Sequence, residues 1–394
     1  MMGRDAVLST FTRATQGADI ALLEGVMGLF DGASPTSDEG STAEIAKWLQ
    51  APVLLVCDTG GMARSVAALA RGFSTFDVDL QVAGLICNRV GSRGHLDLLR
   101  KATEGSPPVM GGLPKESSLA FADRHLGLHS ADRITVSENV FVAWGDRVSE
   151  WCDIDAIIAL AHAAPALPET HAMEQTVTEG VRCRIGLAFD EAFHFYYDDN
   201  LRRLESLGAE LVRFSPIHDA HLPDVDGLYF GGGYPEIHAE DLSRNQSMRT
   251  EVASFAEIQG PIYGECGGLM YLSSGIRTLD RTLYPMVGLI PGEAEMKDRL
   301  QALGYVEVET KENTLLGPAG LRFRGHQFRY SDFHLSPDVE RTYNVCRRRG
   351  GEPFGEGYRR GNTLGSYIHA HWASNPLLVQ GFVQACTTHA RRAQ

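Results

Sequence analysis

The sequence lacks several features that would define large classes of protein. No apolar run is long enough to span a bilayer, and no charged and apolar leader opens the chain. The seven cysteines are scattered without a Cys-x-x-Cys pair, which disfavours a disulfide framework or a zinc site. Basic residues number 36 against 50 acidic ones, and the net charge of −14 argues against nucleic acid or an anionic membrane as partner. We therefore expect a cytoplasmic protein that binds neither.

The length and the pattern of apolar residues predict two α/β domains. A chain of 394 residues is long for one hydrophobic core. In its first part, helical stretches separate four candidate buried strands, Ala18–Leu23, Pro52–Cys57, Val82–Cys87 and Val109–Gly112. Continuous apolar strands that alternate with helices predict a parallel sheet covered on both faces. The predicted bounds are 1–130 for this domain, 131–180 for a helical segment and linker, and 181–394 for a second α/β domain.

Two carboxylates lie in a glycine-rich loop directly after the first predicted strand. Glu24 and Asp31 belong to this loop, and Asn88 follows the strand Val82–Cys87. Carboxylates at the carboxyl ends of parallel strands could hold Mg²⁺ and phosphate oxygens, and a polar loop that merely turns the chain is an equally good interpretation. The sequence Gly-x-x-x-x-Gly-Lys-Ser/Thr, which usually grips the phosphates in such a domain, does not occur in the chain. Any ATP site is therefore expected to be truncated.

The most informative stretch joins a predicted strand to a predicted helix. Pro261–Tyr263 is typical of the end of a buried strand, and Leu269–Leu272 of the first turn of a helix. Between them, Gly264, Cys266 and Gly268 fit the pattern Gly-x-nucleophile-x-Gly of a nucleophile elbow. The glycines allow a sharp turn, and the helix N-terminus favours thiolate over thiol. A buried structural cysteine is the alternative, but the flanking glycines favour a nucleophile.

Two further segments offer the partners that a thiol nucleophile needs. The run Gly231–Gly233 follows a predicted strand and can present N–H groups to a developing oxyanion, although a loop that needs positive φ is an alternative. His369 and His371 end an apolar strand near the end of the chain, and histidine is the usual base for a thiol. The separation of about a hundred residues from Cys266 is compatible with contact in space.

The motifs together resemble a known family. Tyr229–Glu236, Tyr263–Tyr271 and Gly365–His369 are similar to a class I glutamine amidotransferase domain of the cobyric-acid-synthase type. The stretch Leu23–Gly32, Leu-Glu-Gly-Val-Met-Gly-Leu-Phe-Asp-Gly, narrows the resemblance to the cobyrinate a,c-diamide synthase family of the cobalamin pathway. The resemblance extends over essentially the whole chain, and the combination of motifs is specific.

The resemblance implies a fold, ligands and residue roles. It implies a truncated parallel-sheet domain similar to dethiobiotin synthetase, followed by a flavodoxin-like class I glutamine amidotransferase domain. It implies glutamine and a corrinoid tetrapyrrole as partners, ATP and Mg²⁺ as cofactors, and leaves a homo-oligomer open. The implied roles are nucleophile for Cys266, activator for His369, oxyanion donors for Gly232 or Gly233 with Gly267, metal and nucleotide binding for Glu24 and Asp31, and adenine binding for Asn88. Many class I glutaminases place Glu two residues after the His, where this chain has His371, so a dyad is expected rather than a triad.

The implied reaction couples two half-reactions. Cys266 thiolate attacks the carboxamide of glutamine, and the ammonia released displaces phosphate from a corrin acetate that ATP·Mg²⁺ has activated. Two turnovers would give the a,c-diamide. The same motifs fit the amidation of hydrogenobyrinate or of Ni-sirohydrochlorin. A truncated relative that only binds a corrinoid or hydrolyses glutamine is the alternative from another class, favoured by the missing phosphate loop and opposed by the intact cysteine elbow.

Overall fold

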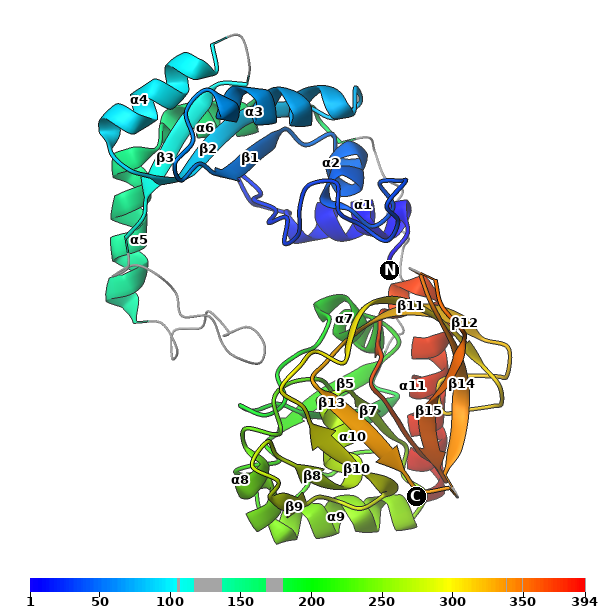
Figure 1. Cartoon of the computed structure of the whole chain (residues 1–394). Helices are drawn as coiled ribbons and strands as arrows, with labels where there is room; N and C mark the ends of the chain where they lie inside the picture. Colours follow the sequence, from blue (N-terminus) through cyan, green and yellow to red (C-terminus); the bar gives the residue numbers. More distant parts are fainter. Residues whose placement is uncertain (105–106, 117–136, 168–179, 338, 349, 394) are drawn as a thin grey trace. The chain divides into compact units, whose positions relative to one another are not determined.

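The computed structural model describes residues 1–104, 107–116, 137–167, 180–337, 339–348 and 350–393 (Figure 1). Contacts between Cα atoms divide the chain into two compact units, one of Phe11–Thr170 and the other of Met1–Thr10 with His171–Gln394. Each unit combines helices with a sheet that contains parallel strands, as the alternating pattern predicts. The predicted α/β fold class is therefore confirmed.

The unit Phe11–Thr170 is built on a three-stranded parallel sheet. The strands lie in the order β1 (Val53–Asp58), β2 (Val82–Val90) and β3 (Val109–Pro114). The helices are α1 (Arg4–Ala14, which extends into both units), α2 (Thr42–Leu49), α3 (Ser65–Phe76), α4 (Arg93–Ala102), α5 (Glu138–Trp151) and α6 (Ile154–His162). The helix α2 begins where Ser41 accepts the N–H of Glu44 at 3.1 Å, a side-chain cap for an otherwise unpaired donor. Three of the four predicted strands are thus confirmed.

The fourth predicted strand, Ala18–Leu23, is wrong. These residues form an extended, irregular segment, and all of them are exposed, Leu22 by 95%. An apolar run becomes a strand only where a neighbouring strand takes its backbone hydrogen bonds, and none of the residues that the structure describes does so for this run. The apolar composition of Ala18–Leu23 therefore led to the prediction of one strand more than the sheet contains.

The helices α5 and α6 pack on β3, within the same unit. Cys152, between the two helices, forms an isolated bridge with Gly111, and the N–H of Asp153 donates to the carbonyl of Met110 at 2.7 Å. These bonds attach the predicted helical segment to the parallel sheet. The domain bounds 1–130, 131–180 and 181–394 themselves remain predictions.

The second unit contains a ten-stranded mixed sheet. Its order is β17 (His369–Ala370), β12 (Arg322–Arg329), β11 (Ala302–Thr310), β14 (Glu340–Arg347), β15 (Phe354–Arg360), β16 (Thr363–Ser366), β7 (Ile262–Glu265), β6 (Gly227–Phe230), β4 (Cys183–Ala188) and β5 (Ala209–Phe214). The strands from β16 to β5 pair in parallel, and those from β17 to β16 are antiparallel. Because β7 and β16 are parallel neighbours, their carboxyl ends lie side by side at one edge.

A smaller sheet and several helices complete this unit. The four-stranded sheet has the order β13 (Ser331–Leu335), β10 (Ile290–Met296), β8 (Ser273–Arg277) and β9 (Leu283–Pro285). The helices are α7 (Asp198–Ser206), α8 (Ala239–Arg244), α9 (Gln246–Glu257), α10 (Gly267–Leu272) and α11 (Leu377–Ala393), with a short 3₁₀ turn, η2 (Trp372–Ser374). In Figure 1 the long α11, in red, lies along the large sheet.

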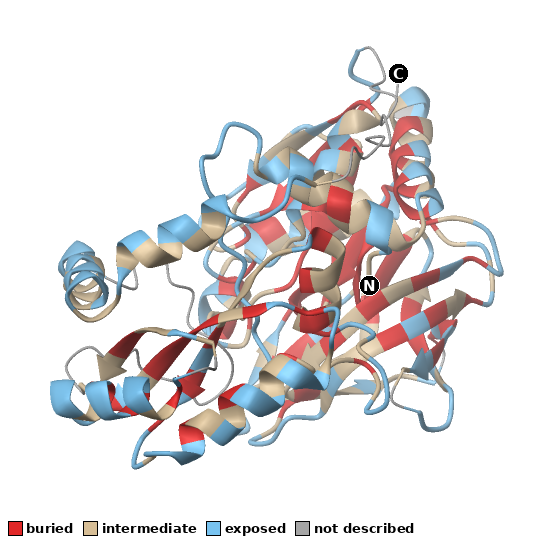
Figure 2. Ribbon diagram, turned by 90° about the horizontal axis from the view of Figure 1, so that it is seen from above, coloured by how far each residue is buried: buried red, intermediate tan, exposed pale blue. Residues whose placement is uncertain are grey.

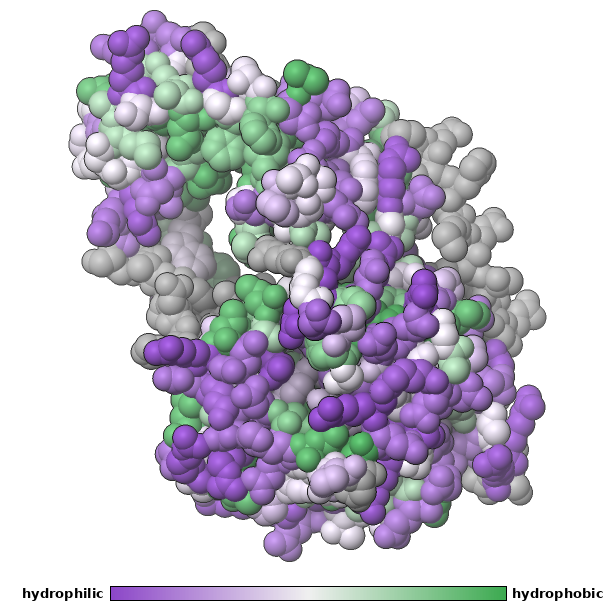
Figure 3. Space-filling model, turned by 45° about the vertical axis from the view of Figure 1, so that its right-hand side comes forward, coloured by the Kyte–Doolittle hydropathy of each residue, from purple (hydrophilic) through white to green (hydrophobic). Residues whose placement is uncertain are grey.

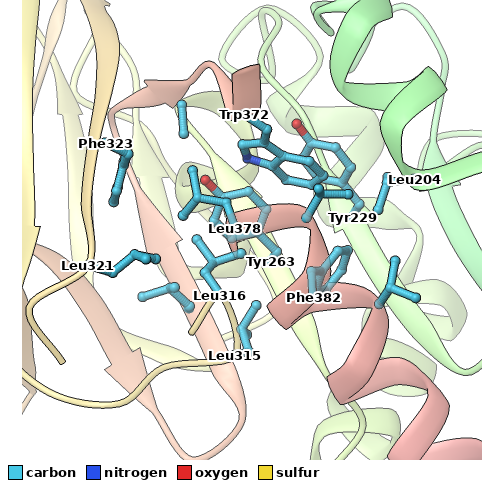
Figure 4. Close-up of a cluster of buried hydrophobic side chains, with 14 of the residues drawn as sticks. Leu204, Tyr229, Tyr263, Leu315, Leu316, Leu321, Phe323, Trp372, Leu378 and Phe382 are labelled. Atoms are coloured by element: carbon cyan, nitrogen blue, oxygen red, sulfur yellow. The ribbon is translucent and has the colours of Figure 1, made fainter. Parts of the chain in front are cut away.

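An aromatic cluster supports the strands that end at this edge (Figure 4). Tyr229 of β6 stacks on Trp372 with ring centroids 5.5 Å apart, and Tyr263 of β7 lies 5.4 Å from Tyr229. Phe382 of α11 closes the cluster from the helix side, 6.2 Å from Trp372. Burying one such side chain contributes about 1.5–3 kcal/mol to the stability of the fold, so the cluster stabilises the positions of β6 and β7.

Burial and hydropathy vary along the strands and helices. Figure 2 shows buried residues along the strands and exposed ones on the outer turns of the helices. Hydrophilic side chains predominate on the face that Figure 3 displays. Within the described ranges, no helix has both the length and the apolar character that crossing a bilayer requires.

Candidate active site

The predicted nucleophile elbow is present in the structure. Cys266 lies between β7 and α10 with φ 50° and ψ −100°, a left-handed conformation that is strained for a residue with a side chain. A Cβ on Gly268 would lie 2.3 Å from the carbonyl oxygen of Phe230, and one on Gly264 would lie 2.7 Å from Leu272 Cδ1. Both flanking glycines are therefore required by close approach, which is the physical reason for the motif.

The structure places His369 at the same edge of the sheet. The N–H of Cys266 donates to the carbonyl of Ser366 at 2.7 Å, so the elbow is bonded to the segment that leads from β16 to β17. His369 lies at the start of β17 opposite His326 of β12, and the Cys266 thiol donates to the carbonyl of Phe328 on that strand at 3.8 Å. These bonds bring the segments that carry Cys266 and His369 to the same edge, and a contact between the thiol and the imidazole remains a prediction.

The imidazole of His369 is held by packing rather than by a carboxylate. Its ring stands edge-on to Phe195, with centroids 5.1 Å apart, and a Cβ on Gly232 would lie 2.5 Å from its Cε1. The buried Nδ1 has no hydrogen-bond partner among the described residues. His371, where a triad would have its acid, points elsewhere: its Nδ1 accepts the N–H of Ala373 at 3.3 Å.

In the glycine run Gly231–Gly233 beside the elbow, the N–H of Gly232 is hydrogen-bonded and that of Gly233 is not, among the described residues. Gly232 donates its N–H to the carbonyl of Phe195 at 3.1 Å. For the N–H of Gly233, the described parts of the chain contain no acceptor. A Cβ on Gly267 would lie 3.2 Å from that nitrogen, so Gly233 and Gly267 are close neighbours. Of the two alternatives for the first oxyanion donor, this hydrogen bonding favours Gly233 over Gly232.

The thiol and the imidazole are both uncharged in this environment at neutral pH. Burial raises the pKa of Cys266 to about 12; Glu236 and Glu265 add to the rise, whereas the N–H of Gly267 and the charge of Arg329 oppose it. Burial likewise lowers the pKa of His369 to about 3. The helix N-terminus therefore does not make a resting thiolate here, because desolvation outweighs the Gly267 hydrogen bond. Proton transfer has to accompany attack on a substrate.

Sequence reasoning missed a buried carboxylate beside the nucleophile. Glu265 is only 1% exposed and accepts three hydrogen bonds, from Tyr263 Oη at 2.8 Å, from Tyr229 Oη at 3.1 Å and from the N–H of Ala370 at 3.1 Å. A charged residue at the end of an otherwise apolar strand was the available signal. Asn200 was missed as well: it donates to the carbonyl of Ala370 at 2.8 Å, and nothing local in the sequence marks it.

The candidate nucleotide residues of the other unit do not form a closed site. Glu24 and Asp31 are both exposed, and Asp31 donates its N–H to the carbonyl of Gly28 at 2.9 Å. Asn88 pairs with Asp58 at the carboxyl ends of β2 and β1, and its side-chain oxygen accepts the N–H of the next residue at 2.9 Å. In the described parts, no group of three or more His, Cys, Asp or Glu could hold a metal ion.

Comparison with known proteins defines the class of this site. Residues 184–377 match the family model described as "CobB/CobQ-like glutamine amidotransferase domain", and residues 1–122 match the one described as "AAA domain". The unit with the cysteine elbow is therefore a glutamine amidotransferase domain. A solved structure entitled "Crystal structure of glutamine amidotransferase" is 21% identical, covers 51% of this chain and 98% of its own, and has a TM-score of 0.39.

The curated relatives specify the family. Cobyrinate a,c-diamide synthase of Leptospira interrogans (strain Fiocruz L1-130) is 51% identical over 98% of this chain and 85% of its own length. The enzymes of that name from Syntrophotalea carbinolica and Listeria monocytogenes (strain F2365) are 48% and 41% identical, over 98% and 95% of this chain and 85% and 83% of their own lengths. The chain belongs to the cobyrinate a,c-diamide synthase family.

Proposed function

We propose that this protein amidates the a and c acetate side chains of cobyrinate in cobalamin biosynthesis, with glutamine as the nitrogen donor. The observation that carries the glutaminase half is the strained Cys266 elbow, with His369 on the adjoining strand segment and the unused N–H of Gly233 beside Gly267. The name shared by the relatives supports the choice of cobyrinate.

Glutamine hydrolysis follows from these residues. As Cys266 Sγ attacks the carboxamide carbon, its proton passes to His369, and the oxyanion accepts the N–H groups of Gly233 and Gly267. The carbon–nitrogen bond then breaks while the imidazolium returns the proton to the leaving nitrogen, which departs as ammonia. His369 next takes a proton from water, whose oxygen attacks the thioester. The carbon–sulfur bond breaks, Cys266 regains a proton and glutamate leaves.

ATP with Mg²⁺ is the proposed source of carboxylate activation, on the strength of the AAA-domain match. ATP supplies a phosphoryl group that turns the carboxylate into a better electrophile for ammonia. Glu24 and Asp31, both exposed, could supply only part of the coordination shell of Mg²⁺, because such sites combine one or two carboxylates with phosphate oxygens and water. The sequence also offers no lysine-bearing phosphate loop.

The test is glutamine hydrolysis by the Cys266→Ala variant, measured as glutamate release. We expect loss of hydrolysis, because no other thiol stands in the elbow. The matched control is Cys346→Ala, which removes an exposed thiol on β14 and should leave hydrolysis unchanged. Equal rates for the wild type and Cys266→Ala would refute the proposed function.

A further inference from the structure

The carboxylate of Glu265 has no part in the reaction derived above, although it lies one residue before the nucleophile. We propose that Glu265 is a positioning residue for glutamine hydrolysis: it fixes the backbone that carries His369 against the elbow that carries Cys266. This inference rests on the proposed glutaminase function. In this role Glu265 touches neither glutamine nor the reacting atoms.

The geometry connects the two halves of the site through one side chain. Glu265 Oε1 accepts the N–H of Ala370 at 3.1 Å and the hydroxyl of Tyr263 at 2.8 Å, and Oε2 accepts the hydroxyl of Tyr229 at 3.1 Å. Ala370 directly follows His369. Glu265 directly precedes the nucleophile Cys266, and its hydrogen bond to Ala370 ties it to the residue that follows His369, 105 positions along the sequence.

The strand that receives this bond is short, and side chains supply much of its hydrogen bonding. The strand β17 is two residues long and pairs with β12 at two positions. The carbonyl of Ala370 is bonded by Asn200, whose side-chain oxygen also accepts the N–H of Trp372 at 2.9 Å. Buried side chains thus hold both polar groups of Ala370, in place of the long ladder that fixes an ordinary strand.

His369 depends on its backbone more than a triad histidine does. Within the described residues no carboxylate binds Nδ1 of its ring, which is buried and has no hydrogen-bond partner there. The ring is positioned by Phe195, by the bare Gly232 backbone and by the course of its own main chain. A displacement of about 1 Å at a catalytic group can cost about 10²-fold in rate, so the Glu265–Ala370 bond matters for turnover.

The burial of Glu265 is poorly explained by stability alone. Removing a carboxylate from water is costly, and apolar residues in place of both the carboxylate and its tyrosine donors would avoid that cost. Burial raises the pKa of Glu265 to about 7, against the opposing effect of its three donors. The other titratable groups that interact with it are Tyr196, Tyr197, Tyr229, Tyr263, Tyr343 and Cys266, all uncharged at neutral pH.

This environment gives activity and stability opposite pH dependences. The ionised carboxylate accepts all three donors, whereas the protonated acid has to turn its own proton toward one of them, so hydrolysis should fall as the pH drops below about 7. In the unfolded chain the carboxyl ionises near the ordinary glutamate pKa of 4.5. Between these values the folded state binds more protons, so stability should decrease as the pH rises. A purely structural residue would not produce this divergence.

The experiment measures kcat and KM for glutamine from pH 5.5 to 9 in three variants of the full chain. For Glu265→Gln, kcat should fall about 10- to 100-fold with KM nearly unchanged, and the inflection near pH 7 should disappear. Tyr263→Phe removes one hydrogen-bond donor that lowers the pKa of Glu265, so the inflection in the kcat–pH profile of this variant should move to higher pH. The matched control is Tyr343→Phe: its buried hydroxyl has no partner within the described residues, and Tyr343 is not among the groups that shift the pKa of Glu265, so its profile should overlay the wild type.

Hydrogen exchange of the peptide spanning residues 366–372 supplies a readout that does not need activity. We expect faster exchange in Glu265→Gln than in the wild type and in Tyr343→Phe. Unchanged kcat and exchange in Glu265→Gln would overturn the inference, as would coincident profiles for Tyr263→Phe and Tyr343→Phe. If the wild type hydrolyses no glutamine, the proposed function fails, and the exchange data alone then decide whether Glu265 holds Ala370.

Discussion

Adding one methyl group at Gly267 should impair the oxyanion site while leaving the nucleophile in place. In Gly267→Ala the new Cβ would lie 2.9 Å from Pro235 Cδ, 3.2 Å from the nitrogen of Gly233 and 3.3 Å from Pro235 Cγ. The first distance is below any ordinary carbon contact, so the Gly233–Pro235 loop has to move by a few tenths of an ångström. That movement carries the N–H of Gly233 away from the position where it would meet the oxyanion.

The expected loss can be estimated from the value of one oxyanion donor. Removing such a donor costs about 10²–10³ in kcat, equivalent to about 2.7–4 kcal/mol. Overpacking at a buried site costs about 1–3 kcal/mol of stability, so the variant should remain folded. Because the N–H groups act on charge that develops in the transition state, KM for glutamine should change little.

The assay is glutamate release under steady-state conditions, with thermal melting as the check on folding. Gly72→Ala is the matched control: its Cβ would have no atom within 4 Å, and it should retain wild-type kcat. If Gly267→Ala melts normally and keeps kcat within twofold of the wild type, about 0.4 kcal/mol, Gly233 and Gly267 are not the oxyanion donors.

Three further outcomes are expected. His369→Asn should reduce glutamine hydrolysis more than His371→Asn, and the reverse order in the same assay would reassign the base. Asn200→Ala leaves the carbonyl of Ala370 and the N–H of Trp372 unpaired, which should lower the free energy of unfolding by about 2–6 kcal/mol in denaturant titrations; an unchanged midpoint would contradict this. The 394-residue chain should bind ATP·Mg²⁺ more weakly than micromolar in calorimetry, and micromolar binding would show that another segment grips the phosphates.

The sequence predicts the parts of this molecule that depend on neighbours along the chain. The elbow can be predicted because Gly264 and Gly268 each lie two residues from Cys266 in the sequence. The close approaches that require these glycines occur within the same strand–turn–helix unit or against the adjacent strand. The strands β1, β2 and β3 can be predicted because each is an apolar run between helices.

Features that depend on distant partners could not be predicted. The choice between Gly232 and Gly233 turns on the carbonyl of Phe195, which no local pattern connects to the glycine run. The role of Glu265 depends on Tyr229 and Ala370, 36 and 105 positions away. The run Ala18–Leu23 has the composition of a strand, but a strand also needs a hydrogen-bonding neighbour, and composition does not report one.

The uncharged state of the resting site has a consequence for chemical labelling. Only thiolates react readily with alkylating agents and mild oxidants, and burial keeps Cys266 in its thiol form, with a pKa of about 12. Cys346 stands exposed on β14. A general thiol reagent at neutral pH should therefore modify Cys346 first and spare Cys266, so that such a screen would point to the wrong cysteine. A glutamine analogue with an electrophilic carbon in place of the carboxamide selects differently, because it reacts only after the site has bound it.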